Sequence, residues 1–139
     1  MLRMITAPTG EPVDIAFVKT LLRIDDDAFD TVLPALISTA REVVERQTGY
    51  ALADAVYAWE PVGSRSAPLP IRPAVVTSAE DTRPIVFRVE PGVVPESLKL
   101  AITMLVGDFI LKPEATTEKI VAENPALKRI LFAHSVVLP

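Results

Sequence analysis

The sequence predicts a mainly helical α+β fold, in which a helical bundle carries a small element of short antiparallel strands. Three observations indicate this class. Apolar residues recur at helical spacing in two long segments, the middle of the chain alternates weakly between apolar and polar residues, and the 13 prolines cluster outside the periodic segments. A chain of 139 residues, half of them hydrophobic, is long enough for one buried core and too short for two of ordinary size.

The first expected helix is short and follows Pro12. Asp14 is suited to be its N-cap, because an aspartate oxygen can accept a hydrogen bond from a free backbone N–H of the first turn. The helix is expected to end near Arg23. Its apolar side consists of Ile15, Val18, Leu21 and Leu22.

A second, longer helix is expected after the acidic run Asp25–Asp27, which we interpret as a cap with favourable charge at the helix start. Apolar residues then follow the i, i+3, i+4, i+7 rule for about five turns, and Gly49 supplies a stop signal. Pro34 would kink this helix or move its start to Asp30 or Thr31. The opposite, polar face of the helix consists of Arg41, Glu42, Glu45 and Arg46.

The segment between the long helices predicts two or three short strands, inserted around residues 55–90. Ile85–Glu90 has the most regular alternation, Ala55–Val62 alternates weakly, and Leu69–Thr77 is broken by Pro70 and Pro73. Because proline cannot donate a hydrogen bond to a neighbouring strand, at least one of these strands is expected at an edge of the sheet.

A third helix is expected from Pro95 to about Leu111, ended by Lys112 and Pro113. Leu100 and Met104 lie outside its main apolar stripe, so the apolar surface is unusually wide. Such a helix is buried on more than one side, either in the core or against a neighbouring subunit. The main stripe consists of Leu98, Ala101, Ile102, Leu105, Val106, Phe109 and Ile110.

The C-terminal segment predicts one more short helix, over Ala126–Phe132, with Asn124 as N-cap and Pro125 as its first residue. The apolar residues Ser135–Pro139 are expected to be extended and to dock onto another surface. We therefore divide the chain into a helical domain over residues 1–123, which includes the strand insertion, and a docking helix with its tail over residues 124–139.

The residue types argue against catalysis, so we expect no enzyme, no cofactor and no metal site. The chain has no cysteine, and its single histidine, His134, lies near the C-terminus. The acidic run does not match a calcium-binding loop, because counting from Asp25 places Leu36 where the bidentate glutamate belongs. The five glycines are too far apart to surround a phosphate.

The charge pattern argues against a sequence-specific DNA-binding protein. The net charge is −4 and the basic residues are scattered, whereas such proteins concentrate basic residues on one face. The N-terminus lacks the apolar core of a signal peptide. Leu98–Leu111 is too short and too interrupted to span a bilayer. We expect a soluble, intracellular protein with no membrane partner.

Four motifs occur in an order that resembles the phage head–tail connector (adaptor) family of long-tailed phages and gene transfer agents. They are a short helix ending in a Leu-Arg-Ile-Asp motif, the end of a long helix, a helix that begins Val-Pro, and a short C-terminal segment. In this chain they correspond to Glu11–Val13 with Leu21–Asp27, to Ala40–Leu52, to Val94–Val106, and to Asn124–Leu131. Together they cover nearly the whole chain except the strand region.

The resemblance implies a structural subunit of the phage neck, found in the virion and, during assembly, in the host cytoplasm. About twelve copies would form a ring beneath the portal protein, with the long helices side by side. The ring would extend the DNA channel toward a stopper or tail-completion protein, and double-stranded DNA would pass through it without sequence recognition.

The resemblance also implies where the contacts lie. The C-terminal helix and tail would dock on the portal through Leu127, Arg129, Ile130, Leu131 and Phe132. Contacts between subunits would involve Leu100, Met104, Arg41 and Glu45.

Three other interpretations fit parts of the sequence. Another neck component, such as a stopper or tail-completion protein, would be richer in strands. A small DNA-binding regulator would use the helices of Asp14–Gly49 as a helix-turn-helix, but the turn Asp25–Asp27 would then face phosphates. An enzyme with a substrate-supplied metal is the third.

Overall fold

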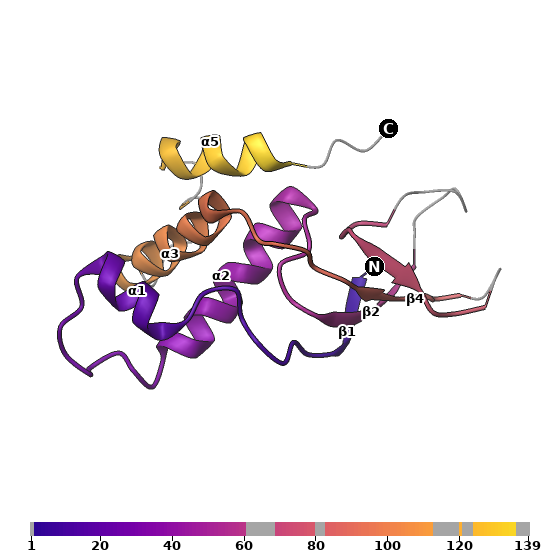
Figure 1. The fold of residues 1–139 in the computed structure, drawn as a ribbon, viewed down its shortest axis with the longest axis horizontal. Coiled ribbons are helices and arrows are strands. Elements are labelled where there is room, and N and C mark those ends of the chain that lie inside the picture. Colours follow the sequence, from indigo (N-terminus) through magenta and orange to yellow (C-terminus); the bar gives the residue numbers. More distant parts are fainter. Residues whose placement is uncertain (1, 61–68, 80–82, 113–119, 121–123, 136–139) are drawn as a thin grey trace.

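The computed structural model describes residues 2–60, 69–79, 83–112, 120 and 124–135. Helices occupy one end of the molecule and a four-stranded antiparallel sheet occupies the other (Figure 1). This arrangement confirms the predicted mainly helical α+β fold. None of the helices in these described residues is long and apolar enough to cross a membrane.

The first helix, α1, spans Ile15–Leu22, as predicted. Asp14 Oδ1 accepts a hydrogen bond from the backbone N–H of Phe17 at 2.8 Å, and Arg23 ends the helix in the left-handed conformation with φ 58°. The helix packs on α3, where a Cβ added to Gly107 would lie 3.0 Å from Leu22 Cδ2. A side chain at this position would therefore push the two helices apart.

The second helix, α2, spans Leu33–Thr48, so it starts later than Asp30 or Thr31. Pro34 becomes the second residue of the helix, where an N–H has no intrahelical acceptor, and the proline ring is tolerated without a kink. Gly49 ends the helix with φ 70°, as predicted.

The acidic run has a different role from the predicted cap of α2, which has no side-chain cap. Asp27 and Asp30 both pair with Lys19 of α1, at 3.3 and 2.8 Å. The hydrogen bond to Asp30 is the main cause that raises the pKa of Lys19. Asp26 Oδ1 accepts from the backbone N–H of Ala28. These interactions fold the connection back onto α1, which explains why the carboxylates lie away from the start of α2.

The sheet contains β1 (Leu2–Thr6), β2 (Ala55–Trp59), β3 (Ala74–Val76) and β4 (Ile85–Val89), in the order β1-β2-β4-β3. Three of these strands were predicted, and the short edge strand β3 directly follows Pro73. Strand β1, the other edge strand, was not predicted. Its register with β2 shifts between Met4 and Thr6, which marks a bulge.

The two faces of the sheet differ in burial. On the inner face, Tyr57 stacks on Phe87 with ring centroids 5.6 Å apart, within a small apolar cluster that also includes Ala55 and Val89. The opposite face, here called the outer sheet face, carries the alternate residues. These residues are Arg3 of β1, Val56 and Ala58 of β2, Val75 of β3, and Val86 and Arg88 of β4.

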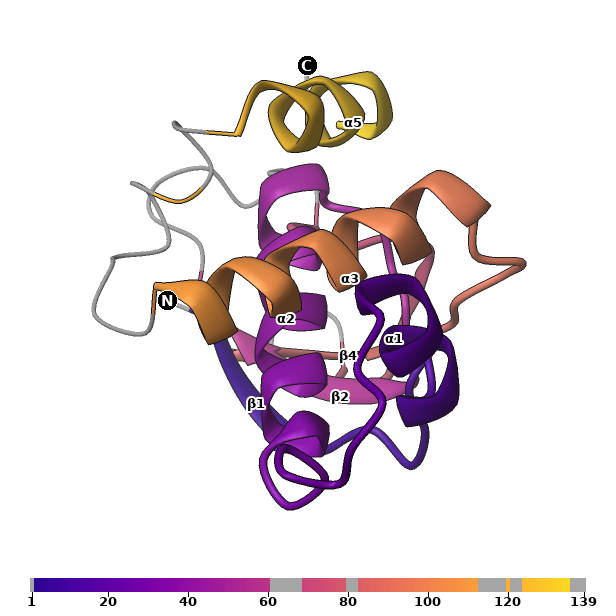
Figure 2. The ribbon, with the colours of Figure 1, turned by 90° about the vertical axis from the view of Figure 1, so that its left-hand side faces the viewer.

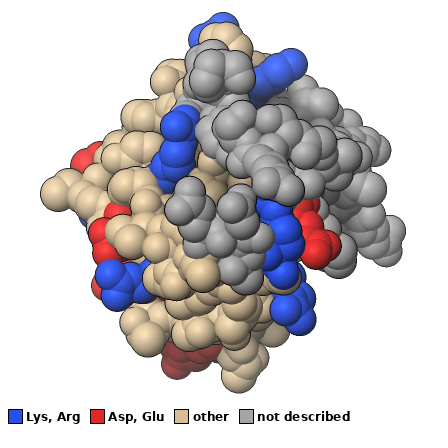
Figure 3. Space-filling model, turned by 90° about the vertical axis from the view of Figure 1, so that its right-hand side faces the viewer, with Lys and Arg blue, Asp and Glu red and all other residues tan. Residues whose placement is uncertain are grey.

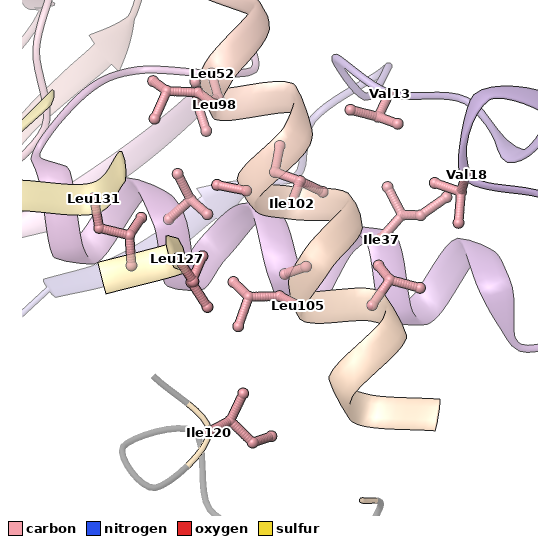
Figure 4. Packing of buried hydrophobic residues seen from close by; sticks show 14 of the residues in the cluster. Val13, Val18, Ile37, Leu52, Leu98, Ile102, Leu105, Ile120, Leu127 and Leu131 are labelled. Carbon is pink, nitrogen blue, oxygen red and sulfur yellow. The ribbon is translucent and has the colours of Figure 1, made fainter. Parts of the chain in front are cut away.

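The helical core lies between α2, α3 (Glu96–Leu111) and α5 (Pro125–His134), and Figure 4 shows its side chains pointing toward one another. The predicted stripe of α3 is confirmed, since five of its members are completely buried and Phe109 and Ile110 are partly buried. The five buried members are Leu98, Ala101, Ile102, Leu105 and Val106.

Helix α5 is part of this core. Asn124 caps it through a 3.2 Å bond from the backbone N–H of Leu127, as predicted. Leu127 and Leu131 are 0% and 4% exposed and belong to the helical core. In Figures 1 and 2, α3 and α2 lie between α5 and the strands. Residues 136–139 of the expected docking tail lie outside the described residues.

Candidate functional site

A buried ion-pair network connects the helical part of the molecule to the sheet. Its centre is Arg41 of α2, whose side chain is only 1% exposed. Arg41 Nε donates to Glu11 Oε2 at 2.7 Å and Arg41 Nη1 donates to Glu45 Oε1 at 2.9 Å. Ser38 Oγ donates to the other oxygen of Glu11 at 2.7 Å. The guanidinium therefore lies between two carboxylates that come from different parts of the chain.

The network reaches the sheet through Glu45, because the Tyr57 hydroxyl donates to Glu45 Oε2 at 3.3 Å. Burial raises the pKa of Glu45, and Arg41 opposes this shift by stabilising the carboxylate. Burial also raises the pKa of Tyr57 to about 12, and the negative charge of Glu45 adds to the effect. Tyr57 therefore stays a neutral donor at physiological pH.

These contacts correct the expectation for Arg41 and Glu45, which we placed on a polar face and in a contact between subunits. Both side chains are 1% exposed, and each already has hydrogen-bond partners inside the subunit. They cannot reach a neighbouring copy while the subunit is folded. Their role is to join α2 to the sheet and to the segment before α1.

The charged groups of the network are paired with one another within the subunit. A hollow of about 250 Å³ adjoins it, between α2 and strands β1 and β2. Within the described residues, every buried side-chain nitrogen and oxygen has a hydrogen-bond partner. The same part of the chain holds no group of three acidic or histidine side chains placed to bind a metal ion.

Helix α5 divides the five predicted portal-docking residues into two sets. Leu127 and Leu131 point into the helical core, as Figure 4 shows. Phe132 is 83% exposed, Arg129 is exposed and Ile130 is half-buried. The helix therefore uses one side to hold itself on the subunit and presents an aromatic and a basic side chain on the other.

The end of α5 is held in place by His134. His134 Nε2 and Ser97 Oγ are 2.6 Å apart, which joins the last turn of α5 to the first turn of α3. Ser135 Oγ donates to the carbonyl of Leu131 at 2.9 Å. The contact between His134 and Ser97 thus restrains the last turn of α5 against α3.

The outer side of α3 and α1 forms a second exposed apolar surface. Leu100 is 38% exposed and Met104 is half-buried, and both lie on the side of α3 that carries Gly107, where α1 packs. Phe17 and Leu21 of α1 are 39% and 45% exposed. Leu100 and Met104 are thus partly exposed, and their predicted contact with a neighbouring subunit stays a prediction.

Sequence reasoning missed Glu11, Tyr57, Phe17 and the outer sheet face as elements of this architecture. Glu11 lies 30 positions from Arg41 along the chain, so no local pattern connects the two. The sequence feature that comes nearest to predicting this network is the i, i+4 spacing of Arg41 and Glu45. On most helices this spacing indicates a solvated surface.

With this geometry described, comparison with known proteins assigns the family. A sequence model described as "Phage gp6-like head-tail connector protein" matches residues 13–126, from the segment before α1 to the start of α5. The chain belongs to this family. Head-tail connector proteins are structural, so the chain is a structural neck component of a phage-like particle, as the sequence analysis predicted.

One solved structure shares the fold of this connector protein. A chain in "Neck of empty GTA particle computed with C6 symmetry" has a TM-score of 0.63 at 18% sequence identity. The alignment covers 100% of this chain and 97% of that chain, so the similarity includes β1 and α5. No curated protein matches this chain.

Proposed function

We propose that this connector protein is a non-enzymatic head–tail adaptor that forms a ring of about twelve copies beneath the portal protein. The ring would extend the DNA channel toward a stopper or tail-completion protein. The family match over residues 13–126 carries this proposal, because it spans every described helix except most of α5. The neighbouring structure is part of the neck of a gene transfer agent particle, which supports the same place in a virion.

The exposed side of α5 is the proposed portal-docking surface. An aromatic ring that is 83% exposed is costly in water and is typical of a residue that becomes buried on binding. Arg129 supplies a charge beside it, and the half-buried Ile130 widens the apolar area. Leu127 and Leu131 contribute indirectly, because they hold the helix in the orientation that exposes Phe132.

The proposed lumen role requires no base recognition. A net charge of −4 disfavours tight binding to phosphates, so DNA would not be held as it passes. Figure 3 views the end of the molecule that carries the sheet, and the basic side chains of the described residues are spread over the part of this end that they form. During assembly the protein would be present in the host cytoplasm before it joins the virion.

The test is the mass of the purified protein, alone and mixed with its cognate portal protein. We expect a ring in the mixture, and we expect the variant Phe132→Ala/Arg129→Glu to lose portal binding about tenfold or more. The matched control is Arg46→Glu, a charge reversal at an exposed residue of α2 that lines the hollow beside β1 and β2. A wild-type protein that stays monomeric and ignores the portal would overturn the proposal.

Point variants are preferable to truncation at Asn124 for this test. Removing residues 124–139 would delete Leu127 and Leu131 and leave the facing side of α3 exposed to water. Loss of binding by the truncated chain would then reflect loss of the fold as well as loss of the docking surface.

A further inference from the structure

The outer sheet face is a surface with the composition of an interface. Val56 and Val86 are half-buried and Val75 is 45% exposed, and none of the three belongs to either hydrophobic cluster of the described residues. These valines alternate with buried residues on three adjacent strands and form an apolar strip, in which Arg88 lies opposite both Val56 and Val75. An α+β domain normally covers such a strip with a helix.

The outer sheet face is also hollowed beside this strip. A depression of about 280 Å³ is lined by Arg3, Ala58, Glu60 and Pro84. Arg3 pairs with Ala58 across β1 and β2, so both line the hollow from the same side of the sheet. The volume is enough for one large apolar side chain.

Among the described residues of this surface, three arginines face two carboxylates. Arg3, Arg83 and Arg88 lie on or beside it, and Glu60 and Glu90 are the carboxylates of the same region. Arg88 pairs with Glu90. Among the described residues, neither Arg3 nor Arg83 forms an ion pair, so these two charges are available to a partner.

Helix α1 presents the complementary surface. Phe17 and Leu21 are one turn apart and both are exposed, although each is a large apolar residue. Asp14 precedes them and the acidic connection follows them, so residues 14–30 contain five aspartates and only two basic residues. Leu100 and Met104 of α3, on the side against which α1 packs, extend the apolar part of this surface.

We propose that α1 of one subunit packs on the outer sheet face of the next, with Phe17 in the hollow over Ala58 and the aspartates near Arg3 and Arg83. The partner is a second copy of this chain. The two surfaces lie at opposite ends of the molecule (Figure 1), so the contact is head-to-tail and can repeat until a ring closes. This inference rests on the proposed ring and names the two surfaces that form it.

The small size of α1 has a consequence for assembly. Eight residues of helix bury much less than the roughly 800 Å² per partner of a stable pair. Two free copies therefore associate weakly, and the ring gains its stability from closure and from the portal. The aspartates around α1 attract Arg3 and Arg83 beside the outer sheet face. This attraction makes association sensitive to salt.

Charge reversal tests the contact with the full-length protein. Asp25→Arg changes the α1 side, at an exposed residue with no side-chain partner among the described residues. Arg3→Glu/Arg83→Glu changes the sheet side. We expect each variant to lower the fraction of portal-bound rings about tenfold, because like charges then face each other. Combining all three substitutions should restore most of the rings, because attraction returns with reversed sign.

Two measurements keep the outcome interpretable. Far-UV circular dichroism and the unfolding midpoint of each variant should match the wild type, and Arg46→Glu should assemble normally. A second variant of the α1 side, Phe17→Ser/Leu21→Ser, should also form fewer rings. Adding the charge reversal on the sheet side should not restore them. Rings that form equally well in every variant would overturn this inference and leave the proposed function standing. A wild-type chain that forms no ring with the portal would overturn both.

Discussion

The helical body and the sheet region are stabilised in different ways. The helical core contains fifteen buried apolar residues drawn from every described helix, whereas the cluster on the sheet contains six. Apolar burial contributes in proportion to the area removed from water, so most of it stabilises the helical body. The sheet is connected to that body by the polar chain Arg41–Glu45–Tyr57.

The difference shows what each kind of contact contributes. Apolar packing tolerates small rotations and substitutions of similar volume, so it stabilises without fixing one arrangement closely. Hydrogen-bonded charges have strict geometry, and a buried ion pair adds little net stability because desolvation opposes the attraction. The helices therefore supply most of the stability, and the network orients the sheet.

The largest expected effect comes from breaking the network on one side. Arg41→Met leaves the buried Glu45 without its cation, and we expect a loss of about 3–5 kcal/mol in the free energy of unfolding at pH 7. Urea denaturation followed by Trp59 fluorescence, for the sheet, and by circular dichroism, for the helices, measures it. The Trp59 fluorescence should change at a lower urea concentration than the circular dichroism signal.

The matched control for this variant is Arg41→Met/Glu45→Leu, which removes both charges and should recover most of the loss. The loss of unfolding free energy caused by Arg41→Met should also become smaller as the pH falls. Burial raises the pKa of Glu45 in the folded state, so the folded state takes up the proton first and the unfavourable charge disappears. A double variant as unstable as the single one would contradict the role given to the network.

The second effect tests the helical side. Leu127→Ala removes a completely buried side chain between α5 and α3 and should cost about 3 kcal/mol. Phe132→Ala, five positions later on the exposed side of the same helix, should change stability by less than about 0.5 kcal/mol. Thermal unfolding of the two variants gives the comparison, and equal losses would show that α5 is not packed as described.

The third effect concerns alkaline pH. Because the pKa of Tyr57 is raised to about 12 in the folded protein, the unfolded chain releases this proton at lower pH, starting near its ordinary value of 10.0. The contribution of Tyr57 to the free energy of unfolding is fully present below pH 10. It decreases by about 1–2 kcal/mol as the pH rises from 10 toward 12. Tyr57→Phe should lack this part of the decline, and an unchanged alkaline profile would contradict the shift.

The smallest effect tests the start of α5. Asn124→Ala removes the side-chain acceptor for the backbone N–H of Leu127 and should cost about 1 kcal/mol. Asn124→Ser keeps a capping oxygen and should lose less. Chemical denaturation distinguishes the two, and identical stabilities would show that the cap contributes nothing.

The helices were predictable because their signals are local. Asp14, Gly49 and Asn124 mark helix ends through contacts with residues at most four positions away, and the structure places all three as expected. Pro34 correctly predicted that α2 starts after the acidic run. The helix starts at Leu33, which is later than the predicted Asp30 or Thr31.

The features that were missed depend on distant residues. Strand β1 exists because it pairs with β2, fifty or more positions away, and its own sequence is short and weakly patterned. The burial of Arg41 depends on Glu11 and, through Glu45, on Tyr57. A charge pair at i, i+4 has the same sequence pattern whether it lies in water or inside the protein. The spacing therefore cannot predict burial.

The directional geometry around Arg41 has a consequence at the scale of a particle. In a closed circle of identical parts, any angular error within one part repeats at every joint and accumulates around the circumference. A guanidinium held between Glu11 and Glu45 leaves little freedom for the sheet to tilt against the helices. The geometry at one buried arginine would then decide how closely each copy in the circle repeats the next.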